Sequence, residues 1–314
     1  MNLPSLKISV VVPVYFNQDS LPQLCDQLDL VSKKCLEKEI QTEVIFVDDG
    51  SKDRSLDVLL KLKDKGFSYS IKIIALARNF GSTVAIRTGI KHVSGNCAIT
   101  LSADLQDPPS IIPEMIDGWL HGNKFVICTR RTRKDPLSSK IFSFLFYRFV
   151  RGFILQDYPS GGFDMALMDE AILPFLLNSS SQLFTPIQVY WMGFRPKVIY
   201  YDRLQRQHGK SKWSMSKKIG LFVDIALSFS VKPARMFSVF GVAISSLSFL
   251  YSIYVIGFAL LMGTAVPGFA STMAVMTFLL AIVIALLSLI VEYLSRIFYL
   301  LSSQPEVVIE SIYD

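Results

Sequence analysis

The stretch CAITLSADLQDPP (Cys97–Pro109) passes from an apolar run to a polar cluster within a few residues. Cys97–Leu101 has the apolar composition of a buried strand, and two prolines close the stretch. Asp104, Gln106 and Asp107 follow at once, so carboxylate and amide oxygens gather where the strand ends. An all-oxygen set of this kind suits Mg²⁺ or Mn²⁺ rather than zinc or copper. The stretch therefore predicts a buried strand that ends at a metal site.

Four similar apolar runs lie on either side of this strand. They are ISVVVPV (Ile8–Val14), EVIFVD (Glu43–Asp48), IKIIAL (Ile71–Leu76) and FVICT (Phe125–Thr129). Amphipathic stretches separate them, which predicts βαβ units and a mainly parallel sheet. Ligands bind beyond the carboxyl ends of such strands. Polar clusters follow the first four strands (PVYFN, DDGSKD, ARNFG and SADLQD), so we expect one shared site, although each cluster alone also fits ordinary turn chemistry.

The C-terminal part of the chain has a different composition. The chain has 314 residues, and its mean hydropathy of +0.40 is high for a soluble enzyme. Residues 236–291 contain no Lys, Arg, His, Asp or Glu, and this run is more than twice the ~20 residues that one membrane span needs. GTAVPGFAST (Gly263–Thr272) can form a turn between spans near Met236–Met262 and Met273–Val291. We expect a two-helix transmembrane hairpin, with a buried apolar hairpin as the alternative.

Charge placement predicts the orientation of this hairpin. Lys and Arg concentrate just before the first span, which places that side in the cytoplasm. The N-terminus has no basic segment of the kind that opens a signal peptide. Four scattered cysteines without a C-x-x-C pair match reduced, partly buried thiols. We therefore expect a catalytic domain over residues 1–235, two transmembrane helices within 236–296 and a short cytoplasmic tail over 297–314.

The second half of the soluble region is strongly basic. Residues 1–128 carry 14 basic and 15 acidic groups, whereas residues 129–235 carry 17 basic and 7 acidic groups. A basic segment beside membrane spans favours lipid headgroups or a lipid-borne phosphate as partner. Nucleic acid is disfavoured, because no recognition motif accompanies the charge. Apolar, basic stretches near residues 137–155 and 214–231 suit helices that lie in a membrane interface, although they also suit helices packed on the sheet.

Five motifs in order carry a family resemblance. They are DDGSKD, RNFG, ADLQDPP, GGFDMALMD and HGKSKW, with the uncharged run after them. This series resembles the inverting polyprenyl-phosphate glycosyltransferases, which include the dolichol-phosphate mannose synthases and the bactoprenol glucosyltransferases. The resemblance implies a glycosyltransferase A-type α/β fold and transfer of a sugar from a nucleotide sugar to a polyprenyl phosphate. It further implies a protein of the bacterial inner membrane, with UDP-glucose as the first donor to test and undecaprenyl phosphate as the acceptor.

The resemblance also implies roles on the donor side. The residues that would line the nucleotide-sugar pocket are Pro13, Tyr15, Asp48, Asp49, Arg78, Ser102 and Asp104. Asp104 and Gln106 would hold Mg²⁺ or Mn²⁺. Relatives usually carry Asp where this chain has Ser102, so an Asp-x-Asp pair is incomplete here. A serine can hydrogen-bond a ribose or a metal-bound water but brings no charge, and we expect weaker metal binding.

On the acceptor side, cations must hold a lipid phosphate. The candidates are Arg130, Arg133, Arg206 and Lys212, because Arg makes planar multidentate phosphate contacts and Lys acts as a point charge. Asp164 of GGFDMALMD is the candidate catalytic carboxylate beside Asp104, acting as a base or positioning the acceptor. A phosphate is already an anionic nucleophile, so positioning is an adequate role.

Other readings stay open at this point. A processive polysaccharide synthase would usually carry Gln-x-x-Arg-Trp, and the nearest match here, Gln188–Trp191, lacks the Arg. A sugar-nucleotide-binding membrane scaffold without turnover would fit Ser102. A synthase that uses another lipid or polysaccharide acceptor and a homo-oligomer are also left open.

Overall fold

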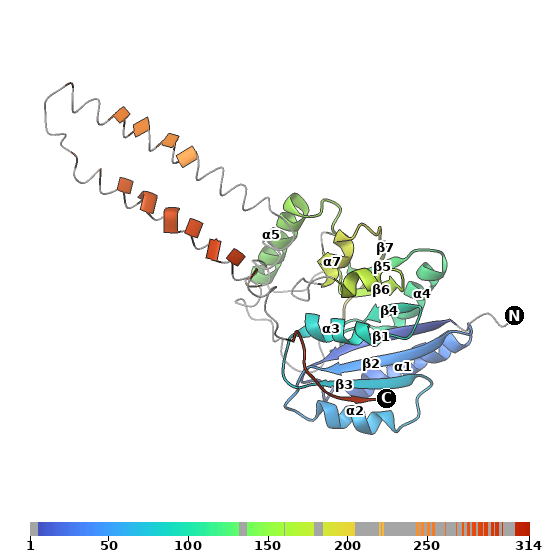
Figure 1. Ribbon diagram of the computed structural model, residues 1–314. Coiled ribbons are helices and arrows are strands. Elements are labelled where there is room, and N and C mark those ends of the chain that lie inside the picture. The colour runs from blue at the N-terminus through green and yellow to red at the C-terminus, as the bar shows by residue number, and fades with distance from the viewer. Residues whose placement is uncertain are drawn as a thin grey trace. The chain divides into compact units, whose positions relative to one another are not determined.

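The computed structural model describes residues 6–131, 137–159, 161–178, 185–204 and 305–314, with scattered residues between 220 and 297. The chain divides into two compact units. One consists of residues 1–220 together with 305–314, and the other of residues 221–304. The first unit is an α/β fold around one eight-stranded sheet (Figure 1).

The sheet is mainly parallel. Its strands are β1 (Lys7–Val14), β2 (Gln41–Asp48), β3 (Ser70–Leu76), β4 (Cys97–Thr100), β5 (Phe125–Arg130), β6 (Met165–Asp169), β7 (Lys197–Tyr201) and β8 (Ile309–Tyr313). Their spatial order is β7-β5-β6-β4-β1-β2-β3-β8. Only β6 and β8, among these strands, run antiparallel to their neighbours. The five strands expected from the sequence are β1 to β5, and the mainly parallel sheet is confirmed.

Helices cover both faces of this sheet. They are α1 (Leu21–Leu36), α2 (Ser55–Lys63), α3 (Ser82–Lys91), α4 (Ile112–Leu120), α5 (Leu137–Phe153), α6 (Leu173–Leu177) and α7 (Thr185–Trp191), with a 3-10 turn η1 (Pro109–Ile111). Val10, Val12 and Val14 of β1 lie in one core cluster with residues of α1. Ile45 and Val47 of β2 lie in a second cluster with α3. Because β1 and β2 are buried on both faces, their sequences are almost continuously apolar.

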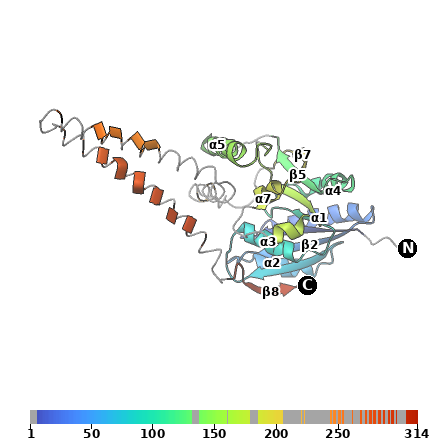
Figure 2. The ribbon, with the colours of Figure 1, turned by 45° about the horizontal axis from the view of Figure 1, so that its top comes forward.

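The chain returns to the sheet after the second unit. β8 pairs antiparallel with β3, with Ile74 opposite Ile312, and it forms the sheet edge seen in Figures 1 and 2. Lys72 of β3 forms an ion pair of 3.0 Å with Asp314 just beyond β8. Residues 297–314, expected to be a short cytoplasmic tail, thus contain a strand of the α/β unit.

The predicted membrane segments fall largely on residues outside the described ones. This applies to the hairpin within residues 236–291 and to most of the helix near 214–231. Among the residues that the structure does describe, no helix combines the length and apolar character needed to cross a membrane. The helix expected near residues 137–155 is present as α5. The hairpin stays a prediction.

The four cysteines are buried, reduced thiols, as their scattered positions predict. Cys25, Cys35, Cys97 and Cys128 are all buried and free of disulfide bonds. Burial raises the pKa of the Cys25 thiol to about 11 and also raises the pKa of the other three. Thiolate chemistry is therefore disfavoured in this unit.

A single glycine controls how the loops after β2 and β3 meet. Gly50 has φ +62, and a Cβ at this position would lie 2.5 Å from the backbone carbon of Arg78. Glycine is required both by the left-handed backbone and by the close approach of the two loops. The second Asp of the DDG turn thereby reaches the loop that carries Arg78.

Gly50→Ala tests this packing. We expect it to lower the thermal unfolding midpoint of the full chain by at least about 4 °C, because a strained backbone and a backbone clash together cost about 2 kcal/mol. Gly66→Ala is the matched control, since Gly66 has φ +73 but nothing within 4 Å of an added Cβ. Equal midpoints for the two variants would show that the approach of the loops contributes nothing.

Candidate functional site

The candidate site lies at the carboxyl ends of β4, β1, β2 and β3. These strands are adjacent and parallel, so the loops that follow them meet at one edge of the sheet. Hydrogen bonds join the loops directly. The Phe16 amide after β1 donates to the Ser51 hydroxyl after β2 at 3.1 Å, and the Ser20 hydroxyl donates to the Ala103 carbonyl after β4 at 2.8 Å. The convergence expected from the sequence is confirmed.

Asp48 is the buried carboxylate of this edge. Its side chain accepts the Ser51 amide at 3.1 Å through Oδ2, while its buried Oδ1 has no hydrogen-bond partner among the described residues. Burial raises the pKa of Asp48. Pro13 and Tyr15 at the end of β1 are half-buried. A buried acceptor oxygen without a donor is costly, so this oxygen fits a ligand that brings an N–H group.

Asp49 has a different role from Asp48. It accepts the Phe80 amide at 2.7 Å, the Gly81 amide at 3.0 Å and the Asn79 side chain at 2.8 Å. Asp49 thus fixes the loop after β3 instead of facing outward. The same loop carries Arg78, which is exposed and stacks its guanidinium over the Phe80 ring at 4.1 Å.

The loop after β4 is organised by Asp104. Its Oδ1 accepts the Ser102 hydroxyl at 2.8 Å and the Gln106 amide at 3.2 Å. Leu105 between them has φ +59, a conformation that non-glycine residues rarely adopt, and its side chain is buried. Ser102 therefore orients the Asp104 carboxylate, which is a role that a second carboxylate at this position would not have.

The donor set at this loop fits a hard divalent cation. Asp104 offers a carboxylate, Gln106 an amide oxygen and Ser102 a hydroxyl, all of them oxygen ligands. In the part of the chain that the structure describes, no group of three or more His, Cys, Asp or Glu side chains could hold a metal ion. Mg²⁺ is commonly bound by one or two carboxylates with substrate phosphates and water, and Asp104 suits that arrangement.

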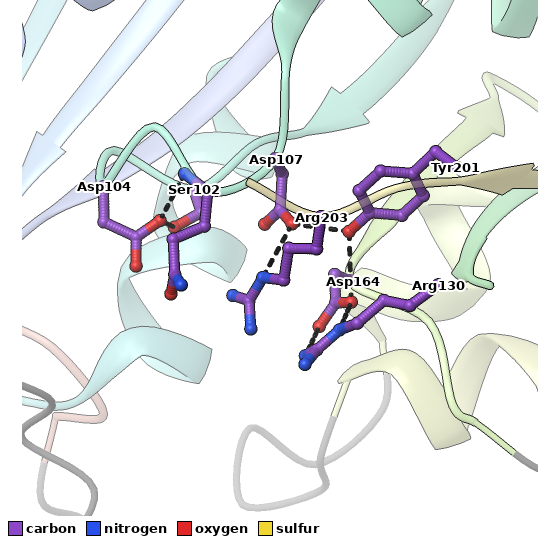
Figure 3. Close-up of polar contacts among 8 residues, drawn as sticks. Ser102, Asp104, Asp107, Arg130, Asp164, Tyr201 and Arg203 are labelled. Carbon is purple, nitrogen blue, oxygen red and sulfur yellow. Dashed lines mark hydrogen bonds and ion pairs between the residues drawn. The ribbon is translucent and has the colours of Figure 1, made fainter. Parts of the chain in front are cut away.

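The Asp107 side chain turns away from Asp104 into a second cluster (Figure 3). It is almost fully buried and accepts the Tyr201 hydroxyl at 2.5 Å and Arg203 Nε at 3.2 Å. Burial raises the pKa of Asp107 to about 6, and the neighbouring charge of Asp164 adds to this effect. Burial and the two carboxylates raise the pKa of Tyr201, which therefore stays a neutral donor.

Asp164 and Arg130 form the other half of this cluster. Arg130 donates from Nε and Nη2 to the two carboxylate oxygens of Asp164, and the Tyr201 hydroxyl lies 3.2 Å from Asp164 Oδ2. Burial opposes the ionised form of Asp164, but the hydrogen bonds and charge of Arg130 hold its pKa below the usual value. Asp164 is thus an ionised, firmly oriented carboxylate.

The structure joins Ser102 and Gln106 to Asp104 and joins Arg130 to Asp164, while Asp49 contacts the loop that carries Arg78. Arg133, Arg206 and Lys212 lie outside the described residues, so their predicted contacts stay predictions. Tyr201 and Arg203 were missed, and Asp107, which the sequence placed in the all-oxygen ligand set, instead accepts hydrogen bonds from Tyr201 and Arg203. The expectation that ligands bind beyond the carboxyl ends of parallel strands could have found them. Tyr201 and Arg203 stand at the carboxyl end of β7, which is parallel to β5.

Comparison with known proteins gives matches of three kinds: a family, sequence relatives and solved structures. Residues 9–173 match glycosyl transferase family 2. An uncharacterized glycosyltransferase of Synechocystis is 33% identical over 96% of this chain and 94% of its own length. The undecaprenyl-phosphate 4-deoxy-4-formamido-L-arabinose transferase of Klebsiella pneumoniae is 30% identical over 98% of this chain and 94% of its own. Among solved structures, glucosyl-3-phosphoglycerate synthase of Mycobacterium tuberculosis has a TM-score of 0.51 at 12% identity, covering 72% of this chain and 79% of its own.

The Arg130–Asp164 pair gives a pH-dependent prediction. We expect Arg130→Met to lower the free energy of unfolding by about 3 kcal/mol at pH 7.5, because it leaves Asp164 as an uncompensated, largely desolvated charge. In the wild type the pKa of Asp164 is lowered, so the ionised carboxylate stabilises the folded state at pH values above the ordinary carboxyl pKa. This stabilisation is lost as the pH falls through the lowered pKa. In the variant Asp164 takes up a proton more readily, so the difference from wild type should shrink at pH 5.

Denaturant unfolding of both proteins at the two pH values measures this effect. Arg131→Met is the matched control, since the Arg131 side chain is 62% exposed and pairs only at 3.9 Å with Asp202. If the loss of unfolding free energy in Arg130→Met were the same at pH 5 as at pH 7.5, the ionised Asp164 would not be its cause.

Proposed function

The chain belongs to glycosyl transferase family 2, and we propose that it transfers a sugar from a nucleotide sugar to a polyprenyl phosphate with inversion at the sugar. We further propose undecaprenyl phosphate as the acceptor and UDP-glucose as the first donor to test. The observation that carries the proposal is the linkage of the Asp104 loop to the Arg130–Asp164 pair through Asp107 and Tyr201. Groups suited to a diphosphate and to a phosphate acceptor thereby share one edge of the sheet.

The donor nucleoside would bind beside Asp48. Its Oδ1, which has no hydrogen-bond partner among the described residues, would accept an N–H from the base, such as the imino group of uracil or guanine. Pro13 and Tyr15 would line the same pocket, and Asp49 would hold the Arg78 loop against it. Arg78 is exposed and can reach an anionic part of the donor.

Asp104 and Gln106 would hold Mg²⁺ or Mn²⁺, with Ser102 orienting Asp104. A cation here neutralises charge on the departing nucleoside diphosphate. An acceptor phosphate oxygen forms the new bond to the anomeric carbon while the bond to the donor diphosphate breaks and its electron pair leaves with the diphosphate. Attack from the opposite face gives inversion.

The acceptor phosphate would lie on the basic side of the site. Arg130, Arg133, Arg206 and Lys212 are the proposed cations, of which Arg130 is fixed by Asp164. The pKa of Asp164 is lowered, so this carboxylate stays ionised at neutral pH. It is therefore better suited to positioning Arg130 or a sugar hydroxyl than to accepting a proton as a general base. The attacking phosphate is itself an anion, so the transfer does not need a strong base to deprotonate the acceptor.

A lipid acceptor requires the site to lie near a bilayer. We propose that residues 236–291 form a transmembrane hairpin and that α5 and the segment near 214–231 lie at the cytoplasmic surface. Two features support this placement: the uncharged run of 56 residues, and apolar side chains such as Leu261, which is 87% exposed in the second unit. On α5, Phe144 and Leu145 are also more than half exposed.

A transfer assay tests the proposed function. Purified full-length protein with Mn²⁺ and undecaprenyl phosphate is incubated with labelled UDP-glucose and then with a panel of other nucleotide sugars. A labelled lipid that yields one sugar on mild acid treatment supports the proposal. Failure of every donor to label the lipid, with nucleotide binding intact, would favour a scaffold without turnover.

Asp104→Ala should reduce sugar transfer at least 100-fold while the thermal unfolding midpoint stays near that of wild type. The substitution removes the anionic ligand of the proposed cation and with it several kcal/mol of charge stabilisation in the transition state. Asp26→Ala on the exposed side of α1 is the control and should retain activity. Full wild-type activity in excess chelator would refute the metal requirement.

Ser102→Asp should raise Mn²⁺ affinity about tenfold, because it places a second carboxylate beside Asp104 and restores the usual pair. Mn²⁺ titration followed by electron paramagnetic resonance measures this without turnover. Ser102→Ala is the companion variant, and it should weaken Mn²⁺ binding, since it removes the hydroxyl that orients Asp104. Unchanged affinity in both variants would place Ser102 outside the metal site.

A further inference from the structure

Arg203 stands two residues beyond the end of β7 and has no role in the function proposed above. Two contacts attach Arg203 and the adjacent Leu204 to the loop of Asp104–Asp107. Arg203 Nε donates to Asp107 Oδ1 at 3.2 Å, and the adjacent Leu204 amide donates to the Gln106 carbonyl at 3.0 Å. The backbone and the side chain of the segment are thus both held against the Asp104–Asp107 loop.

The guanidinium of Arg203 lies in the middle of the site. In the view of Figure 3 it lies between the Ser102–Asp104 turn and the Arg130–Asp164 pair. Its side chain is 22% exposed, whereas that of Asp107 is 2% exposed. The anchoring carboxylate is therefore buried, while the arginine extends from it toward the surface.

Arg203 and Arg130 use their nitrogens differently. Arg130 commits Nε and one terminal nitrogen to a bidentate pair with Asp164. Arg203 commits only Nε to Asp107, and its two terminal nitrogens have no partner among the described residues. A guanidinium held in this way presents its outer edge, which matches two oxygens of a phosphoryl group.

Asp107 explains why the outer edge keeps its orientation. The carboxylate is fixed by the Tyr201 hydroxyl at 2.5 Å, so the Arg203 Nε contact rests on a rigid partner. Holding a long side chain by one nitrogen also lowers the entropy lost when the other nitrogens bind a ligand. The arrangement is suited to binding an anion more than to structural bracing, which would use the bidentate geometry seen at Arg130.

We propose that Arg203 is a phosphate-binding residue of the site, with its terminal nitrogens contacting phosphoryl oxygens between the Asp104 loop and the Arg130–Asp164 pair. The inference rests on the proposed function. The phosphoryl group belongs either to the donor diphosphate or to the acceptor lipid, since both meet at this position. Binding measurements separate these two sources without requiring turnover.

The test compares full-length wild type with Arg203→Gln and Arg203→Lys. Gln can still donate to Asp107 but has no charge, and Lys keeps the charge but loses the planar fork. Arg131→Gln is the matched control, because Arg131 is a neighbouring exposed arginine outside the site. UDP and GDP with Mn²⁺ are titrated by calorimetry, and undecaprenyl phosphate in detergent is titrated separately.

We expect Arg203→Gln to weaken one of these ligands at least about tenfold and Arg203→Lys to weaken the same ligand less, while Arg131→Gln stays within twofold of wild type. Weaker nucleotide binding assigns Arg203 to the donor diphosphate, and weaker lipid binding assigns it to the acceptor phosphate. Nucleotide and lipid affinities within twofold of wild type in both Arg203 variants would overturn the proposal. If wild type binds these ligands without transferring sugar, the proposed function fails while the role of Arg203 is still decided.

Discussion

Parallel pairing of β4, β1, β2 and β3 is the constraint on which the rest of the site depends. It places four carboxyl ends on one edge, where backbone groups and loop residues of different strands can hydrogen-bond to one another. Asp49 after β2 fixes the loop after β3, and Ser20 after β1 fixes the loop after β4. Each loop is therefore held by its neighbour, and the sheet supplies the rigidity that a site for a charged substrate requires.

Charge is balanced within the cluster formed by Asp107, Asp164, Arg130 and Arg203. Asp107 is buried and Asp164 is half-buried, their charges repel, and the Tyr201 hydroxyl lies between them. Arg130 holds the pKa of Asp164 below its usual value, whereas burial raises the pKa of Asp107 despite the opposing charge of Arg203. Burying charged groups is costly unless they are paired and hydrogen-bonded, and here every charge has such a partner. The result is a polar cluster that is oriented before any substrate arrives.

The strands that are continuous apolar runs could be predicted from the sequence, and those that depend on distant pairing could not. β1 to β5 are continuous apolar runs, so they could be predicted, whereas β7 and β8 are short, alternate buried and exposed residues, and join the sheet only through distant partners. The same holds for the site. Asp104, Arg130 and Asp164 stand in recognisable motifs, but no local pattern tells that Arg130 pairs with Asp164, or that Tyr201 reaches Asp107 across 94 positions. Only the folded sheet creates those neighbours.

The position of β8 affects how the protein is made. β3 is synthesised more than 200 residues before β8, so a nascent chain exposes the unpaired edge of β3 while residues 77–308 are translated. At about 5–20 residues per second this interval lasts on the order of ten seconds or more. An open strand edge is a site for mispairing with other chains. The α/β unit thus completes its sheet only after the whole of residues 221–304 has emerged, which links its final folding step to the biogenesis of that second unit.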